Sequence, residues 1–455
     1  MILPWNRRRN SRSSNKSNYK LFQDNLDVEV LMVPLHFRCP ISLDLMKDPV
    51  TLCTGITYDR ESIEKWIESG NCTCPVTNQV LLSFDQIPNH SLRKMIQDWC
   101  VQNRSSGIER IPTPRIPVSH YEVSETCKRI MVEAKRGDVK KIHELVQKIK
   151  NWGKESDRNK RCIVSSDAGC VLSACFESFA NVSMEKNVEL LEEIMSTLTW
   201  LFPLGVEGQA KLGSPASLRC MVEFMKSRSL LDRQNAVLVL KETVYSDQIH
   251  ITTLVEIEGV FESLVSIVRD PICTIATKAS LMTILQMIST PSAISEKIVS
   301  RFEELGLVSL MLEIIVDAEK NICEKALGIL DKMCDWEQGR EKAYENALTI
   351  PVLVKKMLRV SDLATESSVS ILWKLLKKKN NETTRRDDDQ RVGCFVVEAV
   401  QVGAFQKLLV LLQVGCCGGN YAKKVTDLLK LMNLYRGEVE CYDSSMDFKY
   451  LKRPF

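Results

Sequence analysis

The sequence predicts a small α+β domain followed by a long all-α superhelix built from repeated helical units. The chain has 455 residues, too many for one compact core, because domains usually contain about 100 to 200 residues. Residues 33–107 combine short strand-like stretches with helical ones, whereas residues 121–436 show an almost purely helical pattern that repeats. A composition of 44% hydrophobic and 26% charged residues lets most of the chain bury a core and excludes a wholly disordered protein.

The two ends of the chain and one internal segment are expected to lack regular structure. Residues 1–30 form a basic tail in which an apolar start precedes the charges, the reverse of a secretory signal. A solvated tail is the simplest interpretation, and a role in nuclear targeting or in binding an acidic surface is the alternative. Residues 108–120 contain three prolines, which favour an extended linker, and residues 437–455 form a C-terminal tail.

Charge, hydropathy and cysteine usage exclude several classes of protein. A net charge of +3 is too small at this length to argue for nucleic acid as a partner. No stretch approaches the ~18 uninterrupted apolar residues of a membrane span. The 17 cysteines are odd in number, and none stand as Cys-x-x-Cys. Because most lie inside apolar helical patterns, we expect free thiols in a reducing compartment, the cytoplasm, with the nucleus as a second location.

A helical unit recurs along residues 121–436. Similar stretches align on five positions spaced 43, 47, 42 and 56 residues apart, namely Ala236, Ala279, Ala326, Ser368 and Lys424. The last spacing is long because it contains a polar insertion at residues 377–389. A small residue before an apolar helix marks where one helix ends and the next begins, and it occurs at Gly259, Gly306 and Gly403. A helical period of about 40 to 47 residues is that of armadillo and HEAT repeats, which stack into a superhelix with a continuous core.

Residues 33–107 predict a hairpin and two helices joined by loops. Strand-like stretches at residues 50–53 and 56–58 flank Gly55, which suits a tight turn. Asp59 is placed to cap a helix that carries Glu61 in its first turn and ends at Gly70. Apolar residues at helical spacing follow on this helix and on a last one, namely Ile63, Trp66 and Ile67, then Leu92, Met95, Ile96 and Trp99.

Two loops on either side of a helix are the plan of the zinc-binding RING domain, but the zinc ligands are missing. Ser42 and Thr77 stand where a second ligand would follow Cys39 and Cys74. A structural zinc site needs four sulfur or nitrogen ligands, so we expect no metal and no other cofactor. Hydrogen bonds and ion pairs must hold the loops instead, and the polar residues available are Ser42, Asp44, Asp48, Thr57, Asp59, Arg60 and Thr77.

Five short motifs in this segment carry a family resemblance. In chain order they are Cys39-Pro40-Ile41, Asp48-Pro49-Val50, Gly55-Ile56-Thr57-Tyr58-Asp59-Arg60, Ile63-Glu64-Lys65-Trp66 and Cys74-Pro75-Val76-Thr77. Together they resemble the U-box, a metal-free relative of RING. A U-box followed by armadillo repeats resembles the plant U-box ubiquitin ligases. The resemblance implies an E3 ligase whose partners are a ubiquitin-conjugating enzyme, ubiquitin and a protein substrate held by the repeats.

The resemblance also implies which residues contact the conjugating enzyme. U-boxes dock it through apolar groups of the first loop, the central helix and the proline of the second loop, here Ile41, Leu43, Trp66 and Pro75. The alternative is that all four are ordinary core residues. Related domains often carry Arg or Lys at the position of Asn78 to bridge conjugating enzyme and ubiquitin, so an uncharged Asn predicts weaker or more partner-dependent activity. A homodimer through the U-box is a further expectation.

A ligase that forms its own ubiquitin thioester is the competing chemistry. A nucleophilic cysteine needs a neighbouring base, and no recognisable pair is made by any of the five histidines, His36, His90, His120, His143 and His250. We therefore expect packing roles for Cys39, Cys53, Cys72 and Cys74. The chain would then act by proximity, holding the charged conjugating enzyme near a substrate lysine. A scaffold that binds without promoting transfer remains the alternative.

The substrate is expected in the groove of the superhelix. The residue before each aligned position is predicted to face this groove, namely Asn235, Lys278, Lys325, Ser367 and Lys423. The three lysines suggest a basic stripe for acidic or phosphorylated segments, and a solvated helix face is the alternative. The Trp-Asn ladder of nuclear-import adaptors is excluded, because no tryptophan stands at the positions four residues earlier, Leu231, Thr274, Asn321, Leu363 and Gly419.

Overall fold

The structure, a computed structural model, describes residues 33–111, 117–247, 249–290, 294–376, 386–414 and 419–435. The chain forms two compact units, divided between Ile116 and Pro117. The predicted tails and residues 377–385 of the polar insertion lie outside the described residues.

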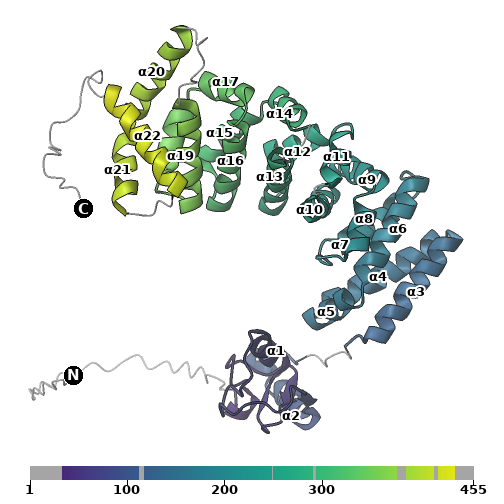
Figure 1. Cartoon of the computed structure of the whole chain (residues 1–455). Helices are drawn as coiled ribbons and strands as arrows, with labels where there is room; N and C mark the ends of the chain where they lie inside the picture. Colours follow the sequence, from purple (N-terminus) through teal and green to yellow (C-terminus); the bar gives the residue numbers. More distant parts are fainter. Residues whose placement is uncertain are drawn as a thin grey trace, which may run out of the picture. The chain divides into compact units, whose positions relative to one another are not determined.

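The first unit combines a small antiparallel sheet with two helices (Figure 1). Its described elements are η1 (Leu35–Phe37), β1 (Pro49–Thr51), β2 (Thr57–Asp59), α1 (Arg60–Glu68), β3 (Ile87–Pro88), α2 (His90–Gln102) and η2 (Arg104–Ser106). The strand order is β2-β1-β3, with Val50 opposite both Tyr58 and Pro88. The predicted hairpin is confirmed, and Gly55 at its turn has a φ of 79°, in the left-handed region that favours glycine.

Both predicted helices of the first unit are present. α1 starts directly after Asp59 and is followed closely by Gly70. α2 starts one residue after Asn89, whose side-chain oxygen caps it by accepting a hydrogen bond from the Leu92 N–H at 3.0 Å.

The first unit has a small hydrophobic core of its own. Its buried members are Phe37, Cys39, Met46, Val50, Leu52, Tyr58, Ile63, Cys74, Leu81, Ile96, Cys100 and Ile111. Ile108 also packs against this core, and the carbonyl of Ile111 accepts a hydrogen bond from the Gln97 side chain at 3.4 Å. The first residues of the predicted linker therefore belong to the folded unit, because Ile111 buries its side chain there.

The second unit is all-α in its described residues. Its helices are α3 (His120–Arg136), α4 (Val139–Glu155), α5 (Asp157–Ser165), α6 (Ala168–Val182), α7 (Val188–Leu198), α8 (Val206–Leu212), α9 (Pro215–Met225), α10 (Leu230–Ser246), α11 (Ile249–Val255), α12 (Val260–Arg269), α13 (Thr274–Ser289), α14 (Ser295–Glu304), α15 (Leu307–Asp317), α16 (Lys320–Met333), α17 (Glu337–Glu345), α18 (Thr349–Lys356), α19 (Asp362–Leu376), α20 (Arg386–Gln401), α21 (Ala404–Val414) and α22 (Gly419–Tyr435).

These helices stack in a regular order. After the pair α3 and α4 they fall into groups of three, from α5–α7 to α20–α22. The last helix of each group packs on that of the next, so that α4, α7, α10, α13, α16, α19 and α22 form a continuous row, here called the third-helix row. Figure 1 shows α10, α13, α16 and α19 of this row side by side. The five aligned positions of the sequence lie in α10, α13, α16, α19 and α22, which confirms the predicted repeat.

One hydrophobic core runs through the second unit, from Val123 in α3 to Met432 in α22. Each group of helices buries its apolar faces against its neighbours, as expected for stacked repeats. The predicted helix boundaries are also confirmed, because Gly259, Gly306 and Gly403 adopt positive φ immediately before α12, α15 and α21. Within the described ranges no single helix is long and apolar enough to cross a membrane, although two bent helix pairs meet the length and composition limits together.

Candidate functional site

Two loops of the first unit share one backbone frame. In loop 1 (residues 39–44) the Cys39 N–H donates to the carbonyl of Asp44 at 2.8 Å, and the Leu43 N–H donates to the carbonyl of Cys39 at 2.8 Å. In loop 2 (residues 74–79) the Cys74 N–H donates to the carbonyl of Gln79 at 2.8 Å, and the Asn78 N–H donates to the carbonyl of Cys74 at 2.9 Å. A β-bridge closes each loop at its base. The backbone therefore holds Pro40 and Ile41 of loop 1 in the same way as Pro75 and Val76 of loop 2.

The fifth residue of each loop has a left-handed backbone. The φ angles are 62° for Leu43 and 56° for Asn78. This conformation is uncommon for residues other than glycine and costs on the order of 1 kcal/mol, with asparagine tolerating it better than leucine. Leu43 is nevertheless 69% exposed, so no burial of its side chain offsets the strain.

The predicted contact residues keep part of their surface free. Ile41 and Pro75 are half-buried in loops 1 and 2, and Asn78 is exposed. Trp66 on α1 is half-buried, and its indole N–H donates to the carbonyl of Thr73 at 2.8 Å. Ile41 and Trp66 pack partly against the core of the unit. Each of these two side chains thus has one side in the core and one side available to a partner.

Asp59, the last residue of β2, holds loop 1 and the segment after it. Its carboxylate accepts hydrogen bonds from the N–H groups of Lys47 and Asp48, both at 2.8 Å. Its own N–H donates to the sulfur of Cys39 at 3.3 Å. The predicted side-chain cap of α1 by Asp59 is therefore wrong, because the carboxylate faces the two upstream N–H groups and makes no cap hydrogen bond.

Tyr58, the preceding residue of β2, reaches loop 2 with its hydroxyl. That oxygen lies 3.0 Å from the sulfur of Cys74 and accepts a hydrogen bond from the Val76 N–H at 3.3 Å. The Thr54 hydroxyl donates to the same sulfur at 3.3 Å. Burial raises the pKa of the Cys74 thiol, but hydrogen bonds from Thr54, Thr77 and Tyr58 outweigh it and lower that pKa to about 6. Burial also raises the pKa of Tyr58.

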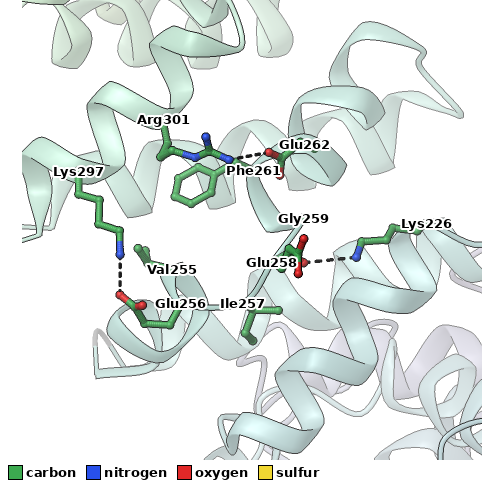
Figure 2. A pocket seen from close by; sticks show the side chains of 10 residues that line it. All are labelled: Lys226, Val255, Glu256, Ile257, Glu258, Gly259, Phe261, Glu262, Lys297 and Arg301. Carbon is green, nitrogen blue, oxygen red and sulfur yellow. Dashed lines mark hydrogen bonds and ion pairs between the residues drawn. The ribbon is translucent and has the colours of Figure 1, made fainter.

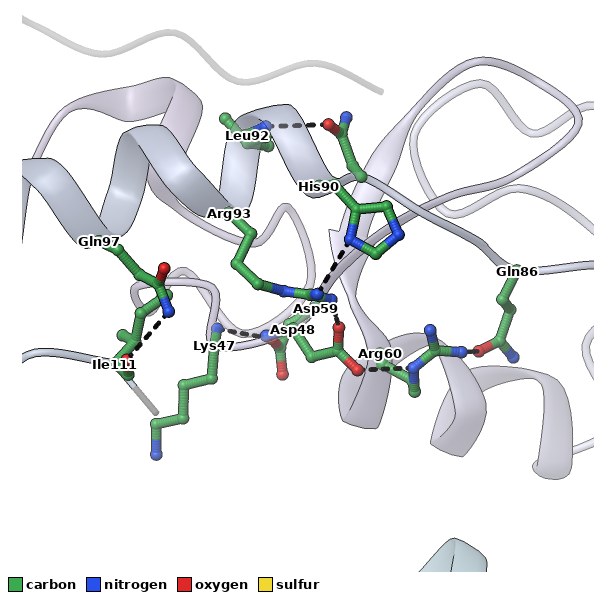
Figure 3. A network of polar contacts seen from close by, with 11 residues as sticks. Lys47, Asp48, Asp59, Arg60, Gln86, His90, Leu92, Arg93, Gln97 and Ile111 are labelled. Carbon is green, nitrogen blue, oxygen red and sulfur yellow. Dashed lines mark hydrogen bonds and ion pairs between the residues drawn. The ribbon is translucent and has the colours of Figure 1, made fainter. Parts of the chain in front are cut away.

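A third set of polar contacts joins the start of β1 to both helices (Figure 3). The Asp48 carboxylate pairs with the guanidinium of Arg60 at 2.7 Å and with that of Arg93 on α2. Arg60 also donates to the Gln86 side chain at 3.1 Å. The three charged side chains are 12 to 21% exposed, so these pairs are largely desolvated.

Sequence reasoning found only part of this scaffold. Asp48, Thr57, Asp59 and Arg60 take part as expected, whereas Ser42 and Thr77 bond to N–H groups within their own loops. It missed Gln86, which precedes β3, Asn89, which lies between β3 and α2, and Arg93 on α2. No spacing rule marks them, because only the fold brings them to residues more than 25 positions earlier in the chain.

The four cysteines that were predicted to pack differ in exposure. Cys39 and Cys74 are buried, as predicted for packing residues, but Cys53 and Cys72 are exposed, which contradicts a packing role for these two. Within the parts of the chain that the structure describes, no group of three or more His, Cys, Asp or Glu side chains could hold a metal ion.

The predicted groove residues all lie on the third-helix row. Lys278 and Lys423 are exposed, and Lys325 and Ser367 are half-buried. Asn235 is only 6% exposed, which leaves little of its side chain for a partner. Of the five residues, Lys278, Lys325, Ser367 and Lys423 therefore keep side-chain surface that a partner could contact.

A cavity of about 510 Å³ lies between the end of α9, the α11–α12 loop and α14 (Figure 2). Three acids and three bases line it. Lys297 pairs with Glu256 and Arg301 with Glu262, each at 2.9 Å, and Lys226 donates to the carbonyl of Glu258 at 3.3 Å. Lys226 forms its ion pair with Glu223, outside the lining, at 2.7 Å. Because acids and bases are equal in number around it, the cavity favours neither an anion nor a cation.

Comparison with known families places both units. The U-box domain model matches residues 33–105. The model of the plant U-box protein ARM repeat region matches residues 122–452, more than half of the chain. The chain belongs to the plant U-box proteins with armadillo repeats. The resemblance and the fold class inferred from the motifs are thus confirmed, and the two units are the U-box and the armadillo region.

The relatives of this plant U-box protein match it over nearly their whole length. U-box domain-containing protein 21 of Arabidopsis thaliana is 47% identical over 93% of this chain and 94% of its own. U-box domain-containing protein 20 of the same plant is 45% identical over 99% of this chain and 98% of its own. The Arabidopsis E3 ubiquitin-protein ligase PUB23 is 33% identical over 93% of this chain and 98% of its own.

Proposed function

We propose that this plant U-box protein is an E3 ubiquitin-protein ligase whose U-box recruits a ubiquitin-charged conjugating enzyme. The observation that carries the proposal is the matched frame of loops 1 and 2, which leaves Ile41, Leu43 and Pro75 partly or largely exposed. Apolar side chains held rigidly at a surface lose little entropy on binding and favour a protein partner. The name of PUB23, an E3 ubiquitin-protein ligase, supports the same activity.

The transfer then needs no bond to the ligase. The amine of a substrate lysine attacks the thioester carbon, and the thiolate that leaves stays on the conjugating enzyme. Cys39 and Cys74 are buried and hydrogen-bonded, so neither can reach a ubiquitin C-terminus. The U-box lowers the barrier by holding the charged enzyme beside the substrate, which raises the effective concentration of the reacting groups.

The armadillo region is proposed to hold the substrate along the third-helix row. Lys278, Lys325 and Lys423 supply positive charge there, which suits acidic or phosphorylated segments. Unchanged binding of such a peptide after Lys278→Glu combined with Lys325→Glu would refute this part of the proposal.

The test is a ligation assay with purified components. The full chain should speed the discharge of ubiquitin from a charged conjugating enzyme to free lysine. Ile41→Ala or Pro75→Ala should reduce the rate at least about tenfold, because each removes a central apolar contact. Val101→Ala, which trims an exposed apolar side chain on α2, serves as the matched control and should change nothing.

Three outcomes of this assay would contradict the proposal. Binding of the charged enzyme without faster discharge would identify a scaffold, an alternative that the uncharged Asn78 favours. Ubiquitin attached to the exposed Cys53 or Cys72 during turnover would identify a covalent ligase. Loss of activity with a zinc chelator would identify a metal-dependent one.

A further inference from the structure

We infer that the hydroxyl of Tyr58 is a positioning group for docking of the conjugating enzyme, because it fixes loop 2 on both sides of Pro75. This inference rests on the proposed function and adds a residue that no motif singled out for docking. Tyr58 is fully buried, so it would act through the loop and not by contact with the partner.

The geometry around the hydroxyl is specific to loop 2. Pro75 lies between Cys74, whose sulfur is 3.0 Å from the Tyr58 oxygen, and Val76, whose N–H donates to that oxygen at 3.3 Å. Proline has no N–H of its own, so the loop cannot be fixed at Pro75 by a backbone donor. The hydroxyl therefore holds the two neighbours of the residue that has to be presented.

Two adjacent residues of β2 each fix one of the two loops. Asp59 fixes loop 1 through its backbone N–H and the segment after loop 1 through its carboxylate, and Tyr58 fixes loop 2 through its side chain. Successive side chains of a strand point to opposite faces, so the Asp59 carboxylate and the Tyr58 hydroxyl reach different segments of the chain. A second donor, the Thr54 hydroxyl, approaches the same Cys74 sulfur at 3.3 Å.

Loss of the hydroxyl should weaken docking without changing the chemistry. In Tyr58→Phe the ring still fills the core, but the Val76 N–H and the Cys74 sulfur lose their shared partner. Two hydrogen bonds are lost, but they act on docking only through the position of loop 2, so we expect the half-saturating concentration of charged conjugating enzyme to rise about fivefold. The maximal discharge rate should stay within about twofold, because the reacting groups belong to the conjugating enzyme and the substrate.

The experiment measures lysine discharge by the full chain as a function of charged conjugating enzyme, together with thermal unfolding of each variant. Thr57→Val is the matched control, because it removes a hydroxyl from the same strand whose partners are Thr51 and Asn89. It should leave the half-saturating concentration unchanged. Thr54→Ala should raise that concentration, and Thr54→Ser should restore it.

The inference is overturned if a folded Tyr58→Phe variant keeps the half-saturating concentration of the parent chain, or if Thr57→Val raises that concentration equally. If Tyr58→Phe fails to fold, the Thr54 variants are compared instead. An unchanged half-saturating concentration in Thr54→Ala then contradicts anchoring of loop 2 through the Cys74 sulfur. A parent chain that does not discharge the conjugating enzyme, or that tolerates Ile41→Ala, defeats the proposed function instead, so the two failures are distinguishable.

Discussion

Leu43 and Asn78 show how single residues shape the two loops of the proposed docking face. Both adopt left-handed backbone at the fifth position of their loops, where glycine would be free of strain. Strained residues persist where the surrounding structure over-determines them, and they cluster at functional sites. In each loop the hydrogen bond from this residue back to the first one imposes the conformation.

Asn78→Arg should increase discharge of the charged conjugating enzyme, by about threefold. A guanidinium can donate several charge-assisted hydrogen bonds to the conjugating enzyme and ubiquitin, whereas the amide of Asn78 carries no charge. Asn78→Gly is the matched control, because it relieves the backbone strain at φ 56° without adding charge. The explanation fails if Asn78→Arg leaves discharge unchanged or lowers it, or if Asn78→Gly raises it as much.

At the level of elements, the U-box is held by side chains that connect strands to helices. Asp48 stands just before β1 and receives guanidinium groups from the first residue of α1 and from α2. Each U-box helix is thereby fixed to the sheet by a largely buried ion pair. A structural zinc ion would connect a small domain in a comparable way, but here the connection depends on charge pairing and geometry.

Asp48→Ala should destabilise the U-box by about 3 to 5 kcal/mol, because it leaves two poorly solvated guanidinium groups without a counter-charge. Denaturant unfolding of the isolated U-box, followed by tryptophan fluorescence, measures the change. Glu61→Ala breaks the exposed pair with Lys65 on α1 and should cost less than about 1 kcal/mol. Equal losses of unfolding free energy in the two variants would show that burial does not make the Asp48 ion pairs more stabilising than the exposed pair.

At the level of the whole molecule, two cores of very different size share one chain. The armadillo core is continuous through the stacked groups of helices, whereas the U-box core has few members and ends with Ile111. Small domains are marginally stable. One additional buried side chain therefore contributes a larger share of the folding stability in the U-box than in the repeats.

Residues 33–111 should fold alone and retain lysine discharge, whereas residues 33–107 should be less stable by about 2 to 3 kcal/mol. The shorter fragment lacks Ile111, which is 5% exposed in the core, and Ile108, which packs on its edge. Urea unfolding of the two fragments compares them directly. Equal midpoints would mean that the segment after Gly107 contributes nothing to the fold.

Local sequence patterns were sufficient to predict the fold class and the repeat, and they also suggested the proposed docking residues Ile41, Leu43, Trp66 and Pro75. Hydrophobic periodicity and turn residues act over a few positions, so the hairpin around Gly55, helices α1 and α2, and the glycines before α12, α15 and α21 could be predicted from neighbours alone. Missing zinc ligands could likewise be read from spacing. Which polar groups connect the loops and helices of the U-box depends on the tertiary structure, because Arg93, Gln86 and the Tyr58 hydroxyl meet their partners across the fold. In the folded chain the Asp59 carboxylate binds the N–H groups of Lys47 and Asp48 and does not cap α1. The reason is that a hydrogen bond forms with the donor that the packed chain brings closest.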